Sequence, residues 1–298
     1  MAGPHTFVGS IDGDFGTAGN FDTGVVPLNG EAWCVNHLTQ RSIDSGLDQS
    51  AKTFSQVDIG PGFNGKKIGT GTSTPFQCDI TKLTVTGAPL ESYFKGTITE
   101  AVANMENQAD DALVLHQCPI TRLNVLAGRV RVTGTVEQPA GSVFFLGSED
   151  DSDDDLHKAV LSVEENVDLT TNNTKIVQMG GTLYDAVSVD DLVLGGGLFY
   201  LGLNADEDTT YTAALALFQQ TGGQLEWAGD GTIAMGHVAG GYFVSSKFDM
   251  AKTLTNLSMY GNGQVDLRRG HNITFTNPIR SLGRYEPQYP IGGTRTFA

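Results

Sequence analysis

The pattern that decides the fold occurs twice in succession, in Ile176-Val-Gln-Met-Gly-Gly-Thr-Leu-Tyr-Asp185 and in Leu192-Val-Leu-Gly-Gly-Gly-Leu-Phe-Tyr-Leu201. Each stretch is a short apolar run, a glycine bend and a second short run. Period-two alternation with β-branched and aromatic residues is typical of strands. Glycine at the bend lets a strand turn a corner while the next coil stacks directly above it. This pattern predicts strand, corner, strand.

The same arrangement recurs on both sides of these stretches. It is found around Gly128 and at three later bends, Gly222-Gly223, Gly240-Gly241 and Gly261-Asn-Gly263. From Gly180 onward the bends are spaced by roughly 15 to 27 residues, which is near the length of one solenoid coil. One coil cannot bury its apolar face alone, so stacking builds a continuous core. We therefore predict an all-β chain whose residues 21–280 form a mostly parallel β-solenoid (β-helix).

Other all-β architectures remain open at this point. An antiparallel β-sandwich or jelly roll also uses short strands at regular spacing, and a jelly roll followed by a short solenoid is a third arrangement. Two-residue hairpin signals are rare in the strand-rich part, at Asp230-Gly231 and Asn262-Gly263. Helical spacing is weak as well: Thr97 to Met105 and Thr209 to Gln220 are the only candidates, and both also fit strands.

The two ends lack the alternation of the body. Residues 1–20 are rich in Gly, Asp and Thr, and residues 281–298 combine prolines, aromatics and arginines. Such segments are ordered mainly when they contact a partner. We therefore expect an N-terminal arm over 1–20 and a C-terminal arm over 281–298.

Composition excludes several functional classes. The chain has 298 residues and a formal net charge of −16, which disfavours binding to nucleic acid and to anionic membranes. It has no run of about 20 apolar residues and no basic start followed by an apolar stretch, so we expect neither a membrane span nor a secretory signal. Three widely spaced cysteines, Cys34, Cys78 and Cys118, fit buried free thiols made in a reducing cytosol.

Candidate chemistry is sparse. In the acidic loop, Asp151, Asp153 and Asp155 alternate as at the start of a calcium-binding loop, but Leu156 replaces the turn glycine and Ser162 the bidentate glutamate. A solvated loop is favoured, with adventitious calcium as the alternative. We expect no metal site and no cofactor.

A β-solenoid suggests a glycoside hydrolase or a polysaccharide lyase. Hydrolysis needs a carboxylate pair, and Asp206 with Asp230, or Glu226 with Asp249, could supply one. A lyase needs a basic residue, for which Arg268-Arg269 and Lys247 are available. No motif supports any of them, so we expect no enzymatic activity and no catalytic residues.

Interface candidates gather in the C-terminal arm and at its root. Arginine and aromatic side chains dominate protein–protein hot spots. The candidates are Arg280, Arg284, Tyr285, Tyr289, Arg295 and Phe297. Trp33, flanked by small and apolar residues, fits core packing better.

Several segments rich in glycine and asparagine lie in the N-terminal part of the chain. The segment Asn20-Phe-Asp-Thr-Gly-Val-Val-Pro-Leu-Asn-Gly-Glu31 leads into Trp33-Cys-Val35, and Gly46-Leu-Asp-Gln-Ser50 and Val57-Asp-Ile-Gly-Pro-Gly-Phe-Asn-Gly65 follow. This texture resembles β-solenoid structural proteins of phage virions. The resemblance implies a late structural protein, made in the host cytoplasm, that binds the major capsid protein and stabilises the capsid exterior as a decoration or cement protein. It also implies a homotrimer. The alternative is a tail-fibre or tailspike host-attachment protein, with or without polysaccharide-degrading activity.

Overall fold

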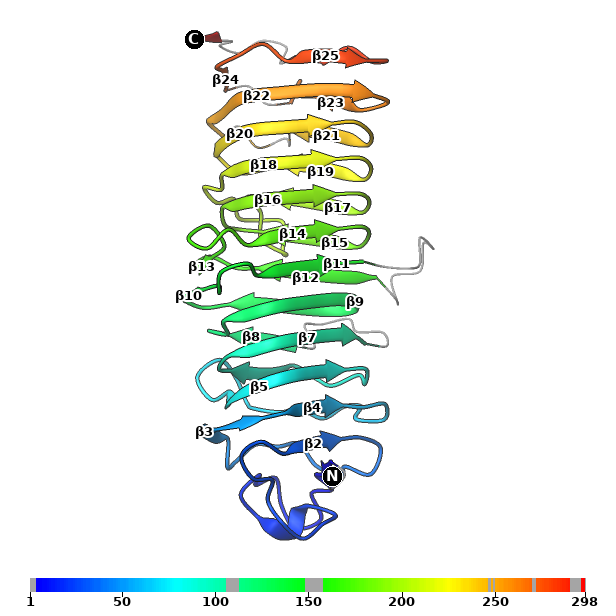
Figure 1. Cartoon of the computed structure of the whole chain (residues 1–298), viewed down its shortest axis with the longest axis vertical. Coiled ribbons are helices and arrows are strands. Elements are labelled where there is room, and N and C mark those ends of the chain that lie inside the picture. Colours follow the sequence, from blue (N-terminus) through cyan, green and yellow to red (C-terminus); the bar gives the residue numbers. More distant parts are fainter. Residues whose placement is uncertain are drawn as a thin grey trace.

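The chain folds into a long β-solenoid of about 10 turns (Figure 1). The computed structural model describes residues 4–105, 113–147, 158–245, 248, 250–269, 272–289 and 296–297, the last two by their backbone alone. The coils follow the chain from the N-terminal end of the rod to the C-terminal end. The predicted β-solenoid is confirmed.

Most coils contribute one strand to a front sheet and one to a back sheet. The front sheet contains β1 (His5–Thr6), β2 (Ala32–Val35), β4 (Gln56–Ile59), β7 (Ile98–Asn104), β11 (Val143–Leu146), β14 (Lys175–Gln178), β16 (Val189–Leu194), β18 (Leu215–Gln220), β20 (Gly231–Val238), β22 (Lys252–Gly261) and β25 (Arg280–Gly283). The back sheet contains β6 (Ser92–Lys95), β8 (Leu113–His116), β12 (Ala159–Val163), β15 (Thr182–Asp185), β17 (Leu198–Leu201), β19 (Gln224–Trp227), β21 (Tyr242–Ser245) and β23 (Gln264–Asp266).

The remaining strands join or flank these two sheets. β5 (Phe76–Val85) and β9 (Ile120–Thr133) are long enough to take part in both, and β3 (Asp48–Phe54) pairs with β5. β24 (Ile273–Phe275) and β26 (Thr296–Phe297) continue the beginning of β22, while β10 (Val136–Glu137) and β13 (Val167–Asp168) form a small side sheet. The only described helix is the three-residue 3-10 turn η1 (Ala18–Asn20). Among the described residues, therefore, no helix is long and apolar enough to span a membrane.

The strands stack in parallel and in register. Ile176 pairs with Leu192, and Leu192 with Phe218, so that equivalent residues of successive coils lie in columns. Every pair of named strands that the structure describes is parallel, which rules out the antiparallel sandwich. Of the two weakly helical stretches, the first is strand β7 and the second contains strand β18 in its C-terminal half.

Glycine makes the corners between front and back strands. Gly181 and Gly197 have φ angles of 69° and 77°, in the left-handed region that glycine adopts without strain. The corners also stack closely, since a Cβ on Gly197 would lie 2.3 Å from the carbonyl oxygen of Gly181. The inside of one corner is closed by Gln178, whose Nε2 donates to the carbonyls of Gly181 (3.1 Å) and Leu198 (3.0 Å).

Inward columns of apolar residues fill the space between the sheets. Trp33 and Trp227 are fully buried, as expected for Trp33. All three cysteines are free; Cys78 and Cys118 are buried and Cys34 is half-buried. Burial raises the pKa of the Cys118 thiol to about 12, so this thiol is inert rather than reactive.

The N-terminal segment is a cap and not an extended arm. In residues 4–20, Phe7 and Phe15 are fully buried, and the Phe15 ring packs edge to face against Trp33 with a centroid distance of 5.0 Å. Buried Asn20 fixes the turn by donating its side-chain amide to Asp12 (2.6 Å). The aromatic cluster covers the first coil, because the open end of a solenoid core would otherwise face water.

The described part of the C-terminal segment also departs from an extended arm. β25 pairs with β22, with Ser258 opposite Arg280 and Gly261 opposite Gly283. Leu267 and Gln288 are then joined by a backbone hydrogen bond of 2.8 Å. Residues 280–289 thus form a last, partial coil, because the edge of β22 offers unpaired backbone groups that the following chain satisfies.

Candidate functional site

The predicted interface residues divide into exposed and buried groups. Arg280, Arg284 and Tyr285 are exposed at the C-terminal end of the rod, and 43% of Tyr285 is accessible. Tyr289 instead packs on the core, with its ring edge to face against Phe275 at a centroid distance of 5.5 Å. Tyr289 is therefore better explained by packing than by an interface.

Two further residues were predicted as interface candidates. Arg295 falls outside the described residues, and Phe297 is described only as part of the β26 backbone.

The C-terminal end face consists of Arg280, Leu282, Arg284 and Tyr285. Leu282 is 77% exposed. The backbone beneath it is fixed, since the Arg284 N–H donates to the Gly261 carbonyl (2.8 Å) and Ser281 Oγ donates to the Tyr285 carbonyl (3.1 Å). Within the described residues β25 pairs only with β22, so this face carries arginine and apolar side chains beside an open strand edge.

A second set of functional side chains lies on the outer surface of the back sheet. We call it the back-sheet track and define it by two outward columns. One column is Arg131, Ser162, Tyr184, Tyr200, Glu226, Val244 and Asp266; the other is Arg129, Val160, Thr182, Leu198, Gln224, Tyr242 and Gln264. Consecutive members belong to neighbouring coils, about 4.8 Å apart.

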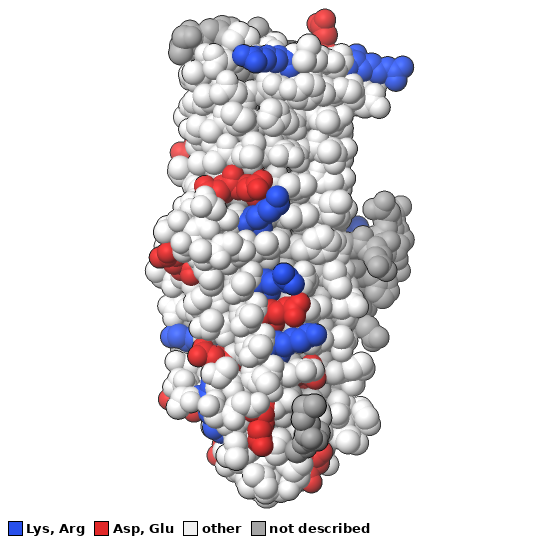
Figure 2. All heavy atoms as spheres, viewed as in Figure 1, with Lys and Arg blue, Asp and Glu red and all other residues white. Residues whose placement is uncertain are grey.

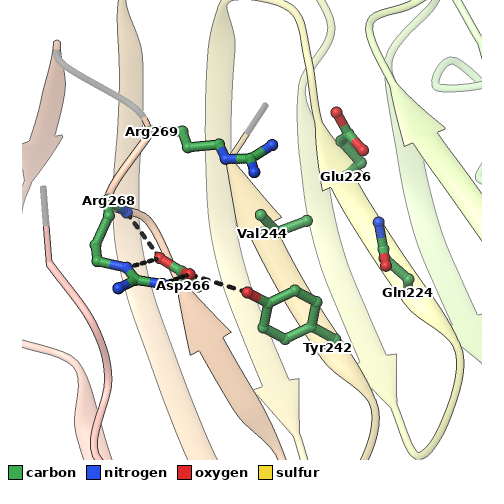
Figure 3. Close-up of a pocket in the computed structure, with 7 residues that line it drawn as sticks. All are labelled: Gln224, Glu226, Tyr242, Val244, Asp266, Arg268 and Arg269. Atoms are coloured by element: carbon green, nitrogen blue, oxygen red, sulfur yellow. Dashed lines mark hydrogen bonds and ion pairs between the residues drawn. The ribbon is translucent and has the colours of Figure 1, made fainter. Parts of the chain in front are cut away.

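A pocket of about 500 Å³ lies at the C-terminal end of this track (Figure 3). It is lined by Gln224, Glu226, Tyr242, Val244, Asp266, Arg268 and Arg269. The Asp266 carboxylate accepts Nε and Nη2 of Arg268 at 2.9 and 2.6 Å, and the Tyr242 hydroxyl at 2.9 Å. Arg268 holds the pKa of Asp266 at about 2, so this carboxylate is charged over the whole physiological range.

Arg269 differs from its neighbour. Figure 3 shows its side chain extending over Val244 toward the side of the pocket where Glu226 lies. No described residue accepts a hydrogen bond or ion pair from its guanidinium, whereas Arg268 is held in a two-point contact. Arg269 can therefore turn its donors to a ligand without breaking an existing contact.

A second pocket of about 200 Å³ lies toward the N-terminal end of the track. Arg131 Nε is 3.3 Å from Glu164 Oε1, and the Tyr184 hydroxyl donates to Glu207 (2.9 Å). The lining residues are Arg129, Arg131, Ser162, Val163, Glu164, Glu165, Tyr184, Ala186, Asn204, Ala205, Asp206 and Tyr211.

Two stacked tyrosines connect the pockets. The rings of Tyr184 and Tyr200 are nearly parallel, with an interplanar angle of 6° and a centroid distance of 5.0 Å. Burial, with the carboxylates of Glu207 and Glu226, raises the pKa of Tyr200 to about 12. Both phenols thus stay neutral and can donate a hydrogen bond at any ordinary pH.

The structure does not place Asp206 and Asp230, the first carboxylate pair considered for hydrolysis, in one pocket. Asp206 lines the smaller pocket, whereas Asp230 precedes β20, lines neither pocket described above, and accepts Ala213 N–H through its carbonyl (2.9 Å). Glu226 lines the larger pocket, but Asp249 lies outside the described residues. Of the basic candidates, Arg268 and Arg269 line the larger pocket and Lys247 is not described.

No cluster of three or more His, Cys, Asp or Glu side chains able to hold a metal ion occurs among the described residues. The acidic loop with Asp151, Asp153 and Asp155 lies outside them.

Sequence patterns singled out Glu226 but not the back-sheet track as a whole, because consecutive members are 16 to 31 positions apart, as in Tyr184 to Tyr200 and Arg131 to Ser162. One signal was present in the repeat itself. Tyr184, Tyr200, Glu226 and Val244 each stand three residues after a corner glycine with positive φ, namely Gly181, Gly197, Gly223 and Gly241. A fixed offset from the corner therefore gives the outward column.

Comparison with known proteins identifies no relative of this chain. No family model matches the chain, and no curated protein or solved structure is significantly similar to it.

Proposed function

We propose that the chain is a structural virion protein that binds the exterior of a phage capsid and stabilises it, as a decoration or cement protein. The major capsid protein is the proposed partner, and the C-terminal end face is the proposed contact. The texture of the sequence motivates the class, and the solenoid fold agrees with it.

The C-terminal end face is the observation that carries this proposal. It concentrates Arg280, Leu282, Arg284 and Tyr285 in six residues of a chain whose net charge is −16. Arginine makes two-point contacts to carboxylates and tyrosine adds rigid apolar area, which is the composition of interface hot spots. A leucine that is 77% exposed loses contact with water when such a face docks. Many weak contacts on a symmetric lattice add up through multivalency.

Self-association is part of the same proposal, with a homotrimer as the expected state. Figure 2 shows a nearly white region on the front sheet, above a stripe of alternating charges. We call its outward residues the front platform: Leu217, Gln219, Met235, His237, Asn256 and Ser258, in two registered columns. Copies of an acidic chain repel one another least where carboxylates are absent, so the front platform is the favoured contact between copies.

Co-sedimentation with phage heads stripped of this chain tests the capsid contact. The triple variant Arg280→Ala, Arg284→Ala, Tyr285→Ala should bind heads at least tenfold more weakly than the unaltered chain. A double variant of exposed front-sheet residues, Lys82→Ala with Arg122→Ala, should bind normally and controls for nonspecific charge effects. Equal binding by the triple variant and the unaltered chain would remove the end face from the interface.

A further inference from the structure

The back-sheet track is continuous along the rod. Six register steps separate Arg131 from Asp266, which corresponds to ~29 Å at about 4.8 Å a step. One pocket opens at each end, and Tyr200, which stacks on Tyr184 of the smaller pocket, lies between them. Parallel in-register stacking places all of these groups on one line, so a ligand that contacts both pockets must be extended along the solenoid axis.

The charges of the track are nearly balanced. In the larger pocket, Arg268 and Arg269 face two carboxylates, those of Glu226 and Asp266. In the smaller pocket two arginines stand with three carboxylates; these residues are Arg129, Arg131, Glu164, Glu165 and Asp206. Neither pocket has an excess of positive charge to offset a chain of net charge −16, so polyanions such as nucleic acid or sulfated glycans are disfavoured.

The chemistry of the lining favours hydroxyl groups. Planar carboxylates accept only, guanidinium groups donate only, and amides such as that of Gln224 do both. A ligand that satisfies this mixture must present donors and acceptors side by side, as neighbouring hydroxyls do. Tyrosine offers an apolar ring with a polar edge, which suits the apolar face of a ring that carries hydroxyls on its rim. Aliphatic ligands are disfavoured, because Val244 is the only aliphatic residue lining the larger pocket.

We propose that the back-sheet track is a binding site for a linear, uncharged polysaccharide. Tyr184 and Tyr200, whose faces stack on each other, present their outer ring edges to sugar rings along the track, while Arg269 and Gln224 hydrogen-bond to hydroxyls in the larger pocket. The Asp266 carboxylate already accepts four hydrogen bonds, three from Arg268 and one from Tyr242, so it fixes these two side chains at the wall of the pocket. This site lies apart from the C-terminal end face and does not depend on capsid binding.

Affinity electrophoresis of the full chain tests the proposal. Native gels would each contain one polysaccharide: linear glucan, xylan or mannan as neutral polymers, and alginate as an anionic one. At least one neutral polymer should retard the chain and alginate should not. Either Tyr200→Ala or Arg269→Ala should weaken that retardation at least tenfold. Arg269 is an exposed residue without a described partner, so its variant keeps the test valid even if Tyr200→Ala perturbs folding.

A matched control lies on the opposite sheet. Thr81→Ala alters an exposed, uncharged side chain of β5 that belongs to neither the track nor the front platform, and should leave retardation unchanged. Three outcomes would each overturn the proposal: no neutral polymer retards the chain, only alginate does, or neither track variant weakens the retardation tenfold.

Discussion

Two carboxylates of the back sheet respond to pH in opposite directions. Asp185 points into the core between Val163 and Leu201, is fully buried, and accepts one hydrogen bond, from Val187 N–H (3.2 Å). Burial raises its pKa well above 3.8, so the folded chain keeps this proton after the unfolded chain has released it. The stability that protonated Asp185 contributes is complete below pH 3.8 and declines as pH rises from there toward the folded pKa.

Replacing Asp185 by asparagine tests the direction of this pH dependence of stability. Asp185→Asn copies the neutral acid in shape, so its free energy of unfolding should match that of the unaltered chain near pH 4 and exceed it at pH 8. Urea unfolding at both pH values gives the comparison. A variant that is equally destabilised at both values would show that burial does not control this group.

The Asp266 carboxylate affects the pH dependence of stability in the opposite direction. Its pKa of about 2 lies below 3.8 because Arg268 stabilises the charged form, so its contribution is present above pH 3.8 and is lost as pH falls through about 2. Asp266→Asn should therefore destabilise the chain at pH 7, and the difference from the unaltered chain should shrink in acid. Arg268 is half-exposed, which limits the loss to the modest range of surface ion pairs.

Adding a side chain at a corner glycine has a backbone cost and a stacking cost, and Gly141, which precedes β11 and is not at a corner, isolates the first of them. Gly197 and Gly141 have nearly the same φ, 77° and 75°, but a Cβ on Gly197 would clash with the Gly181 carbonyl oxygen while one on Gly141 meets nothing within 4 Å. Gly141→Ala should cost about 1–2 kcal/mol for the left-handed backbone. Gly197→Ala should cost clearly more, measured by denaturant unfolding. Equal costs would mean that close stacking of corners adds nothing.

At the scale of the elements, the corner is a repeated unit whose inward position is occupied by different side chains in different coils. Gln178, Leu194, Gln220, Val238 and Met259 occupy the same inward position of successive front strands. The Gln220 amide donates to the carbonyls of Gly223 and Tyr242, both at 3.1 Å, yet its own Oε1 is buried without a partner. The Gly223 carbonyl already accepts Tyr242 N–H (2.9 Å), so it keeps one partner if the amide is removed.

Gln220→Leu should therefore change the free energy of unfolding by less than about 1 kcal/mol, because the lost hydrogen bonds are offset by removal of the unpaired acceptor. Gln220→Ala should cost more, since it leaves a cavity. Thermal unfolding of both variants decides between these effects. A leucine variant as unstable as the alanine variant would mean that the amide hydrogen bonds are essential to the corner.

Sequence patterns predicted these elements well where the repeat is strict and poorly where it ends. The runs around Gly181 and Gly197 gave the strands and corners, because period two and corner glycines are local properties. The cap was missed because Phe7 and Phe15 follow no period; their burial depends on Trp33 and Phe76, which arrive later in the chain. The back-sheet track was missed because register, not sequence proximity, brings its residues together.

At the scale of the whole molecule, we expect three rods to assemble through the front platform. Light scattering should give three times 31.6 kDa for the purified chain. The double variant Gln219→Glu with Met235→Glu adds like charges to the front platform of every copy and should release monomers. Lys82→Glu, in the registered column Lys82, Glu100 and Arg122, should not. A stable monomer for the unaltered chain at micromolar concentration would exclude this contact.

The central claim is that the rod attaches to a capsid by its C-terminal end face. Electron cryo-microscopy of intact virions, with antibody labelling of this chain, tests it most directly. We expect solenoid density over the whole head surface, with the coil that contains β25 nearest the shell and the N-terminal cap outermost. Label confined to tail tips, or rods whose C-terminal coil points away from the shell, would contradict the claim.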